Sequence, residues 1–144
     1  MEDYGFCNKT FTANLKSPLT DLAGLTQATI ELTAQNASND FVYSQSIPEN
    51  ATDPHVKKVL TECVKDYNLI MQFFTQAMRS FAFRDYKGML NYELPHSRLV
   101  AFCQEAFNYA KPGPVNITYL TERNRQLRIL IAMSVVTGHY LLSQ

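Results

Sequence analysis

Apolar residues recur every three or four positions along most of this chain. The clearest series consists of Val56, Leu60, Cys63, Tyr67, Ile70, Phe74, Ala77 and Phe81. Alternating steps of four and three place such residues in one stripe along an α-helix. Asp53 and Pro54 precede the series, as a capping residue and a first-turn proline do. The sequence therefore predicts a long amphipathic helix that begins at Pro54.

Three further helices are predicted on the same grounds. The first runs from about Asp21 to Ser46, and the last from about Ile117 to Leu142. Between them, residues 85–110 carry a stripe made of Met89, Tyr92, Leu99, Phe102, Cys103 and Ala106. Pro95 interrupts this third helix, and a proline inside a helix removes a hydrogen bond at a cost of about 3 kcal/mol. We expect a bend or break near residues 93–96.

The predicted fold is all-α. No run of residues alternates as a strand does, and four long helices joined by short connections can bury their stripes in few ways. We predict an antiparallel up-down-up-down four-helix bundle over residues 21–144. The reversal between the second and third helices falls at residues 82–85, where Asp85 can cap the new helix. Residues 1–20 show weak periodicity and form a separate N-terminal extension.

Cys63 and Cys103 lie at equal distances from this reversal, because their midpoint is residue 83. In an antiparallel helix pair, residues equally far from the turn lie at the same height. Two thiols at one height on facing stripes favour a disulfide over other uses of these residues. The bridge would close a loop of 41 residues, which stabilises the fold by roughly 4 kcal/mol in the chain-entropy estimate.

Composition and charge argue against several functions. The chain has 13 basic and 13 acidic residues, whereas a nucleic-acid surface needs a concentrated basic face. We interpret the one basic cluster, Arg123, Arg125 and Arg128, as a solvated helix face. With 46% hydrophobic residues, the 144-residue chain can bury the core of one domain. Its longest apolar stretch, residues 127–136, is too short to span a bilayer.

The residues that could carry chemistry are scattered. His55, His96 and His139 lie on different elements without partners at metal-ligand spacing, so we interpret them as surface or helix-end residues. Three isolated carboxylates lie on or near the third helix: Asp85, Glu93 and Glu105. The helix dipole and solvation account for them. No glycine-rich phosphate loop or nucleophile motif occurs, so the sequence predicts neither an enzyme nor a cofactor.

Four Asn-x-Ser/Thr sites occur in the chain, at Asn8, Asn36, Asn50 and Asn116. They are candidate N-glycosylation sites, and together with a disulfide they favour the secretory pathway. The residues Met1–Tyr4 have neither the basic start nor the apolar run of a signal peptide. The odd third cysteine, Cys7, leads us to expect a missing N-terminal segment.

Several short stretches resemble one known family. They are Asp21-Leu22-Ala23-Gly24-Leu25, Ala51-Thr52-Asp53-Pro54, Cys63 followed by Tyr67, Asp85-Tyr86, Cys103 with Phe107, and Asn124 before an apolar C-terminal helix. The match is to the plant pectin methylesterase inhibitor and invertase inhibitor family, and it covers nearly the whole chain. The resemblance implies a four-helix bundle preceded by an N-terminal helical hairpin, secreted to the apoplast or the vacuole. It also implies an inhibitor that covers the active-site cleft of a carbohydrate-active enzyme and carries no cofactor.

The resemblance also bears on the cysteines. The family's second disulfide corresponds to Cys63 and Cys103. Its first joins Cys7, in the stretch Tyr4-Gly5-Phe6-Cys7, to an earlier cysteine that this chain lacks. We therefore interpret residues 1–20 as the remnant of an incomplete hairpin. We predict that this segment is loosely held, without apolar surface to pack on, and that Cys7 has no intramolecular partner.

The target is predicted from the start of the third helix. Invertase inhibitors typically carry Pro-Lys-Phe where this chain has Tyr86-Lys87-Gly88, so a pectin methylesterase is the favoured target. The chain also departs from pectin methylesterase inhibitors, with Phe102 at a usual threonine position and non-acidic residues at three acidic ones: Lys65, Leu69 and Gln72. The residues expected to contact the partner are Asp66, Asp85, Tyr86, Lys87, Gln104 and Glu105.

Other readings of the chain stay open. An invertase inhibitor is the nearest alternative. An inactive relative or truncated gene product is another. A third is a non-inhibitory extracellular bundle, similar to relatives known as pollen allergens or binding a small apolar ligand. An internal apolar cavity would favour the ligand-binding bundle, and an exposed patch of mixed polarity across the second and third helices would favour an inhibitor.

Overall fold

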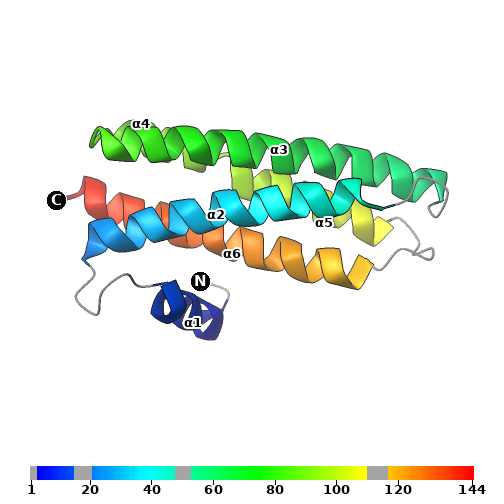
Figure 1. Ribbon diagram of the computed structural model, residues 1–144, viewed down its shortest axis with the longest axis horizontal. Coiled ribbons are helices and arrows are strands. Elements are labelled where there is room, and N and C mark those ends of the chain that lie inside the picture. Colours follow the sequence, from blue (N-terminus) through cyan, green and yellow to red (C-terminus); the bar gives the residue numbers. More distant parts are fainter. Residues whose placement is uncertain (1–2, 15–20, 48–52, 110–116) are drawn as a thin grey trace.

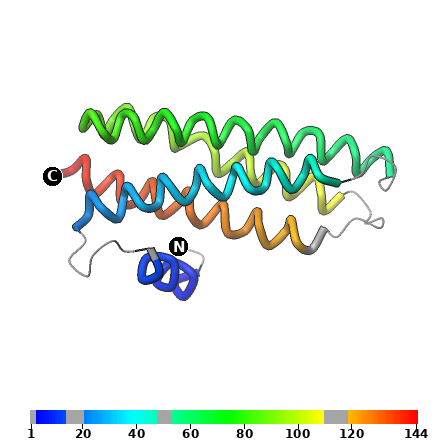
Figure 2. Tube along the Cα trace, in the orientation of Figure 1, coloured from blue at the N-terminus to red at the C-terminus, as the bar shows by residue number. Residues whose placement is uncertain are grey.

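The computed structural model describes residues 3–14, 21–47, 53–109 and 117–144, in which every regular element is a helix (Figure 1). The helices are α1 (Tyr4–Asn14), α2 (Leu22–Gln45), α3 (Pro54–Ala82), α4 (Tyr86–Glu93), α5 (His96–Tyr109) and α6 (Ile117–Leu142). Helix α2 packs on α3 and α6, and α4 and α5 complete the bundle by packing on the same two helices. Figure 2 shows α4 and α5 following one another along α3. The predicted all-α four-helix bundle is confirmed.

Four helices begin at an aspartate whose side chain accepts a hydrogen bond from a backbone N–H of the first turn, and in α1 that residue is Asp3, which accepts from Phe6 at 2.8 Å. Asp21 accepts from Gly24 at 2.9 Å, Asp53 from His55 at 2.8 Å, and Asp85 from Gly88 at 2.9 Å. Each bond satisfies one of the donors that a helix start leaves unpaired. The caps at Asp53 and Asp85 are therefore confirmed, and so is the helix start near Asp21.

The third bundle element is broken where proline predicts it. Helix α4 ends at Glu93 and α5 begins at His96, so Leu94 and Pro95 separate them. At its other end, the reversal before α4 places Arg84 at φ 59°, in the left-handed region that favours glycine. The chain turns here within a few residues, as the sequence predicts.

The buried side of the helix continues in phase across the break. The buried residues Met89 and Glu93 of α4 are followed in steps of four and three by His96, Val100, Cys103 and Phe107 of α5. Phe102, which the sequence places in the apolar stripe, is 55% exposed. That assignment was wrong because the buried line passes through two polar residues, Glu93 and His96, which a stripe of apolar residues leaves out.

Two polar residues interpreted as surface groups lie in the core instead. Glu93 is fully buried, with Oε1 accepting a hydrogen bond from the Ser134 hydroxyl at 2.8 Å. His96 is also buried, and its ring lies 4.6 Å from that of Phe73 between centroids. The interpretation of Glu93 as a solvated residue was wrong, because its partner Ser134 comes from the distant helix α6. His96 does lie at a helix end, as one of its two interpretations has it, but it is buried rather than on the surface.

The N-terminal segment is also better packed than predicted. Helix α1 lies against α2 and α6 (Figure 1), and the buried Cys7 packs with Ile129, Leu130 and Met133 of α6. Asp3 forms an ion pair with Arg125 at 2.9 Å. The prediction that this segment has no apolar surface to pack on was therefore wrong, since α6 supplies that surface. Cys7 is free, as the sequence predicts.

Candidate functional site

The centre of the candidate site is the disulfide between α3 and α5. Cys63 and Cys103 are bonded, with their Cα atoms 5.2 Å apart, and the predicted pairing is confirmed. Beneath the bridge, the Tyr67 hydroxyl donates to Asn124 Oδ1 at 2.6 Å. The Asn124 amide nitrogen lies 3.6 Å from Cys103 Sγ. Covalent and hydrogen bonds thus hold α3, α5 and α6 in one fixed arrangement.

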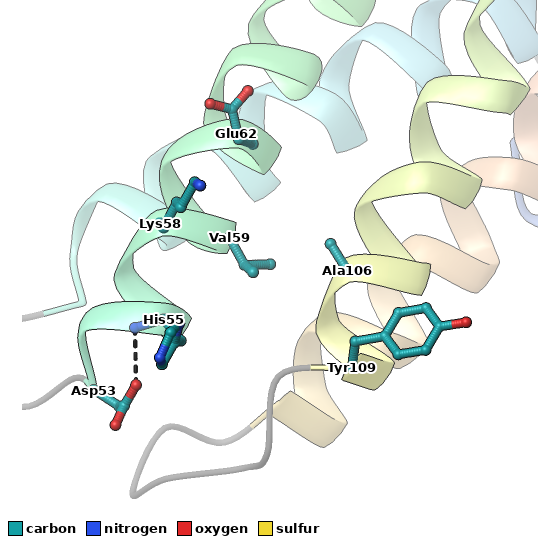
Figure 3. A pocket seen from close by; sticks show the side chains of 7 residues that line it. All are labelled: Asp53, His55, Lys58, Val59, Glu62, Ala106 and Tyr109. Atoms are coloured by element: carbon teal, nitrogen blue, oxygen red, sulfur yellow. Dashed lines mark hydrogen bonds between the residues drawn. The ribbon is translucent and has the colours of Figure 1, made fainter.

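An open groove of about 700 Å³ runs between the first turns of α3 and the last turns of α5 (Figure 3). Its lining consists of Asp53, His55, Lys58, Val59, Glu62, Ala106 and Tyr109. Val59 and Ala106 point toward one another across the groove, and the Tyr109 ring extends outward. The groove therefore has an aliphatic floor and polar walls.

Two rows of side chains border this groove and extend beyond it. Glu62, Asp66 and Leu69 are spaced i, i+4, i+7 on α3, which places them on one side of that helix. Phe102, Ala106 and Tyr109 have the same spacing on α5. Since Glu62 and Ala106 line the same groove, the two rows face the same way. We call these six residues, together with the neighbouring exposed Glu105, the α3–α5 face.

The α3–α5 face exposes large apolar side chains. Phe102 is 55% exposed and Tyr109 is 88% exposed. Leu69 is partly exposed across the groove. The Phe102 ring thus lies on the surface, where a partner can contact it. Large exposed aromatic side chains flanked by charged ones are typical of protein-binding surfaces.

The acids of this face are not equivalent. Asp66 is half-buried; burial first, and the nearby Glu62 second, raise its pKa to about 6, while Lys65 acts in the opposite direction. No hydrogen bond from a described residue stabilises its carboxylate. Glu62 instead forms an exposed ion pair with Lys65 at 3.5 Å. Among the acids of this face, Asp66 is therefore the one whose charged form burial disfavours.

The structure separates the predicted contact residues into two groups. Asp66, Gln104 and Glu105 lie near the disulfide, whereas Asp85, Tyr86 and Lys87 lie beyond the end of α3. From Asp66 to the last residue of α3 is sixteen residues, or about 24 Å at the helical rise. Within the second group, the Asp85 carboxylate caps α4, and the half-buried Tyr86 ring lies 6.1 Å from that of Phe81. Only Lys87 of that group is exposed and uncommitted to a cap or a ring contact.

Gln104 is built into the bundle. Its amide nitrogen donates to Asn108 Oδ1 at 2.9 Å and to Thr121 Oγ1 at 3.1 Å. Its oxygen accepts from Asn124 Nδ2 at 3.0 Å. These bonds use most of the capacity of the side-chain amide. Gln104 therefore fixes the rotation of α5, while the exposed Glu105 beside it remains available to a partner.

Sequence reasoning missed the aromatic part of this face. The apolar stripe expected for the third helix includes Phe102 and leaves out the polar Glu93 and His96, so it runs beside the buried line. Steps of four and three from Met89 through Glu93 and His96 lead to Cys103 and Phe107, and they leave Phe102 and Tyr109 off the buried side.

The candidate modification and ligand sites are placed as follows. Asn8 is exposed on α1, whereas Asn36 is half-buried and donates to the Leu32 carbonyl at 2.9 Å. Asn50 and Asn116 lie outside the described residues. Within the described ranges, no three His, Cys, Asp or Glu side chains gather as a metal site would require. No helix of the described chain is long and apolar enough to cross a membrane.

Comparison with known proteins gives relatives of one kind. No family model matches the chain. Over 88 residues, 61% of the chain, it is 32% identical to "Pectinesterase inhibitor 2" of Arabidopsis thaliana, covering 51% of that protein. Over 84 residues, 58% of the chain, it is 32% identical to a "Putative invertase inhibitor" of Platanus acerifolia, covering 47% of it. The chain thus spans about half the length of the curated relatives it matches.

The fold has a solved counterpart. The crystal structure of a pectin methylesterase inhibitor from Arabidopsis thaliana superposes with a TM-score of 0.77, covering 94% of this chain and 92% of that one at 20% identity. This likeness establishes the fold. Together with the two sequence relatives, it confirms the resemblance to pectin methylesterase inhibitors and invertase inhibitors that the sequence motifs indicate.

Proposed function

We propose that the protein is a secreted plant inhibitor of a carbohydrate-active enzyme, namely a pectin methylesterase, and that it covers the enzyme's active-site cleft with the α3–α5 face. The names of the sequence relatives support an inhibitor rather than an enzyme. The observation that carries the proposal is the exposed Phe102 ring beside a disulfide that fixes both helices of this face.

The physical chemistry of the face suits protein binding. Affinity in such interfaces is concentrated in a few aromatic anchors surrounded by a polar rim. Phe102 and Tyr109 are the aromatic candidates, and Glu62, Asp66 and Glu105 supply an acidic rim. Because the Cys63–Cys103 bridge and the Tyr67–Asn124 bond hold the helices rigid, little ordering entropy remains to be lost on binding.

A basic surface beside the target's cleft would complement this rim. At pH values above about 6 the Asp66 carboxyl is ionised, so a lysine or arginine of the enzyme would find an uncompensated negative charge there. The disulfide also agrees with an oxidising compartment, which supports secretion to the apoplast or the vacuole.

An invertase is the second candidate target, and one feature favours it. The turn between α3 and α4 exposes the Phe83 ring by 86% and places Arg84 beside it in a left-handed conformation. The tip of the bundle thus offers an aromatic ring and a cation, although Gly88 has no ring where invertase inhibitors carry the phenylalanine of Pro-Lys-Phe. A deep acidic sugar-binding pocket could accept such a tip. The pectin methylesterase remains the first choice because the α3–α5 face combines two exposed aromatic rings, Phe102 and Tyr109, with the neighbouring acids.

Titration of both enzyme classes with the purified protein tests the proposal. We expect pectin methylesterase activity to fall in proportion to the inhibitor added, with acid invertase unaffected. Inhibition of the invertase alone would replace the proposal by the second candidate. Failure to inhibit or bind either class would favour a non-inhibitory bundle.

A further inference from the structure

The inference concerns Glu93, a buried carboxyl at the break between α4 and α5. Glu93 is the last residue of α4, and its side chain is 0% exposed. Oε1 accepts a hydrogen bond from Ser134 of α6 at 2.8 Å. Oε2 has no hydrogen-bond partner among the described residues. The end of α4 is therefore attached to α6 through a carboxyl group of which only one oxygen has a hydrogen-bond partner among the described residues.

Close packing on α6 makes this attachment tight. A side-chain carbon at Gly138 would lie 2.8 Å from Met89 Cε, 3.0 Å from Leu90 Cδ2 and 3.6 Å from Glu93 Oε2. The absence of a side chain at Gly138 is what allows α4 and its carboxyl to approach α6.

The groups around Glu93 offer no positive charge. Helix α6 presents Ser134 and Gly138. Helix α5 presents the buried His96, which packs on Phe73 of α3, and burial lowers the His96 pKa, which disfavours its charged form. Burial raises the pKa of Glu93 to about 7, and the hydrogen bond from Ser134 lowers it by a smaller amount. No charged side chain of the described residues contributes to this pKa. An ionised Glu93 would thus be a buried charge without a partner.

We propose that the Glu93 carboxyl is a proton-controlled latch for α4. In its neutral form it stays buried and holds the end of α4 against α6. When it loses its proton it turns to solvent, and α4 detaches by bending at Leu94–Pro95, where the helix is already broken. The moving part carries Tyr86 and Lys87 and the turn before them. The latch does not depend on which enzyme the protein binds.

Amide hydrogen exchange measured at pH 6 and pH 8 tests the latch. The exchange rates are first corrected for the intrinsic effect of pH, and the amides of α2 serve as the reference. Burial lowers the His96 pKa, and the Glu93→Gln variant, which keeps His96, separates any contribution of that ring from the contribution of Glu93. The opening equilibrium of residues 86–93 should rise about tenfold between these pH values and level off above pH 7, because the open form ionises at the ordinary glutamate pKa. In Glu93→Gln this rise should vanish. Glu105→Gln, which neutralises an exposed acid on α5, should behave as the unmodified protein.

A second measurement keeps the test decisive if Glu93→Gln does not fold. Carbon-13 NMR of the unmodified protein should show one glutamate carboxyl that titrates near pH 7. Two results would overturn the proposal: α4 exchange that does not change relative to α2, or a Glu93 carboxyl that titrates at the ordinary value. Persistence of the pH dependence in a folded Glu93→Gln variant would do the same.

Discussion

At the scale of single residues, the bundle is organised by a few buried polar groups. Tyr67 is fully buried, and its hydroxyl hydrogen bond to Asn124 lies directly under the disulfide. Burial raises the Tyr67 pKa beyond its ordinary range, with Asp40 adding to the effect, so the phenol remains a donor. The Asn124 amide nitrogen in turn donates a hydrogen bond to Gln104 Oε1 of α5. The orientation of the α3–α5 face therefore depends on this set of hydrogen bonds.

Replacing Tyr67 with phenylalanine should expose that dependence. The substitution keeps the ring but leaves Asn124 Oδ1 without its 2.6 Å donor. An unpaired buried acceptor destabilises a fold by about 1–3 kcal/mol. Urea unfolding should show a loss of that size for Tyr67→Phe and almost none for Tyr119→Phe, whose ring is largely exposed. Equal losses in the two variants would contradict the assigned role.

The buried Glu93 predicts how global stability varies with pH. Its folded-state pKa is raised to about 7, so between about pH 4.5 and 7 the folded chain holds a proton that the unfolded chain has lost, and the free energy of unfolding falls as pH rises. Glu93→Gln removes that loss. At pH 8 the variant should be more stable than the unmodified protein by roughly 3 kcal/mol, with no such gain at pH 4. Thermal unfolding at both pH values checks this, and an equal gain at pH 4 and pH 8 would contradict it.

At the scale of helices, periodicity and capping residues predicted most of what is observed. Asp53–Pro54, Asp85 and Pro95 each mark a helix boundary in the structure. The buried side of α5 was misassigned because its line passes through the polar residues Glu93 and His96, which an apolar pattern leaves out. Nor could the surroundings of Glu93 be predicted, because Ser134 and Gly138 are more than forty positions away and no local pattern joins them to it.

The docking of α1 could not be predicted either, since it depends on one arginine of α6. Arg125 binds Asp3 at 2.9 Å and lies 5.7 Å from the centre of the Phe6 ring. It also binds Glu122 within α6 at 2.9 Å. This arginine thus connects α1 to the bundle through both charge and ring contacts, alongside the apolar packing of Cys7.

Substituting Arg125 with alanine should loosen α1 alone. The ion pair is partly exposed and screened by solvent, so its loss, together with the loss of the ring contact, should weaken the attachment only modestly. Amide exchange in residues 4–14 should accelerate several-fold, while α2–α5 stay unchanged. Arg98→Ala, an exposed arginine on α5, serves as the control. Unchanged exchange in α1 would mean that apolar packing holds it without Arg125.

At the scale of the whole molecule, the sequence predicted the fold and the disulfide but not the shape of the candidate site. It proposed six contact residues, and the structure divides them between the disulfide region and the far end of α3. Exposure depends on how α5 is rotated about its axis, and the hydrogen bonds of Gln104 with α6 help to fix that rotation. The rotation of a helix about its axis is set by tertiary contacts, and the sequence pattern indicates it only approximately.

The most direct test of the account is the inhibition constant of Phe102→Ala against a pectin methylesterase. Phe102 is proposed as the central anchor of the α3–α5 face, and removing such an anchor weakens binding by about 2 kcal/mol or more, which is over tenfold. Tyr140→Ala is the matched control, because Tyr140 is an exposed aromatic residue on α6, outside the α3–α5 face. We expect inhibition to weaken more than tenfold in Phe102→Ala and to stay unchanged in Tyr140→Ala, with both variants folded. Unchanged inhibition by Phe102→Ala would contradict the account.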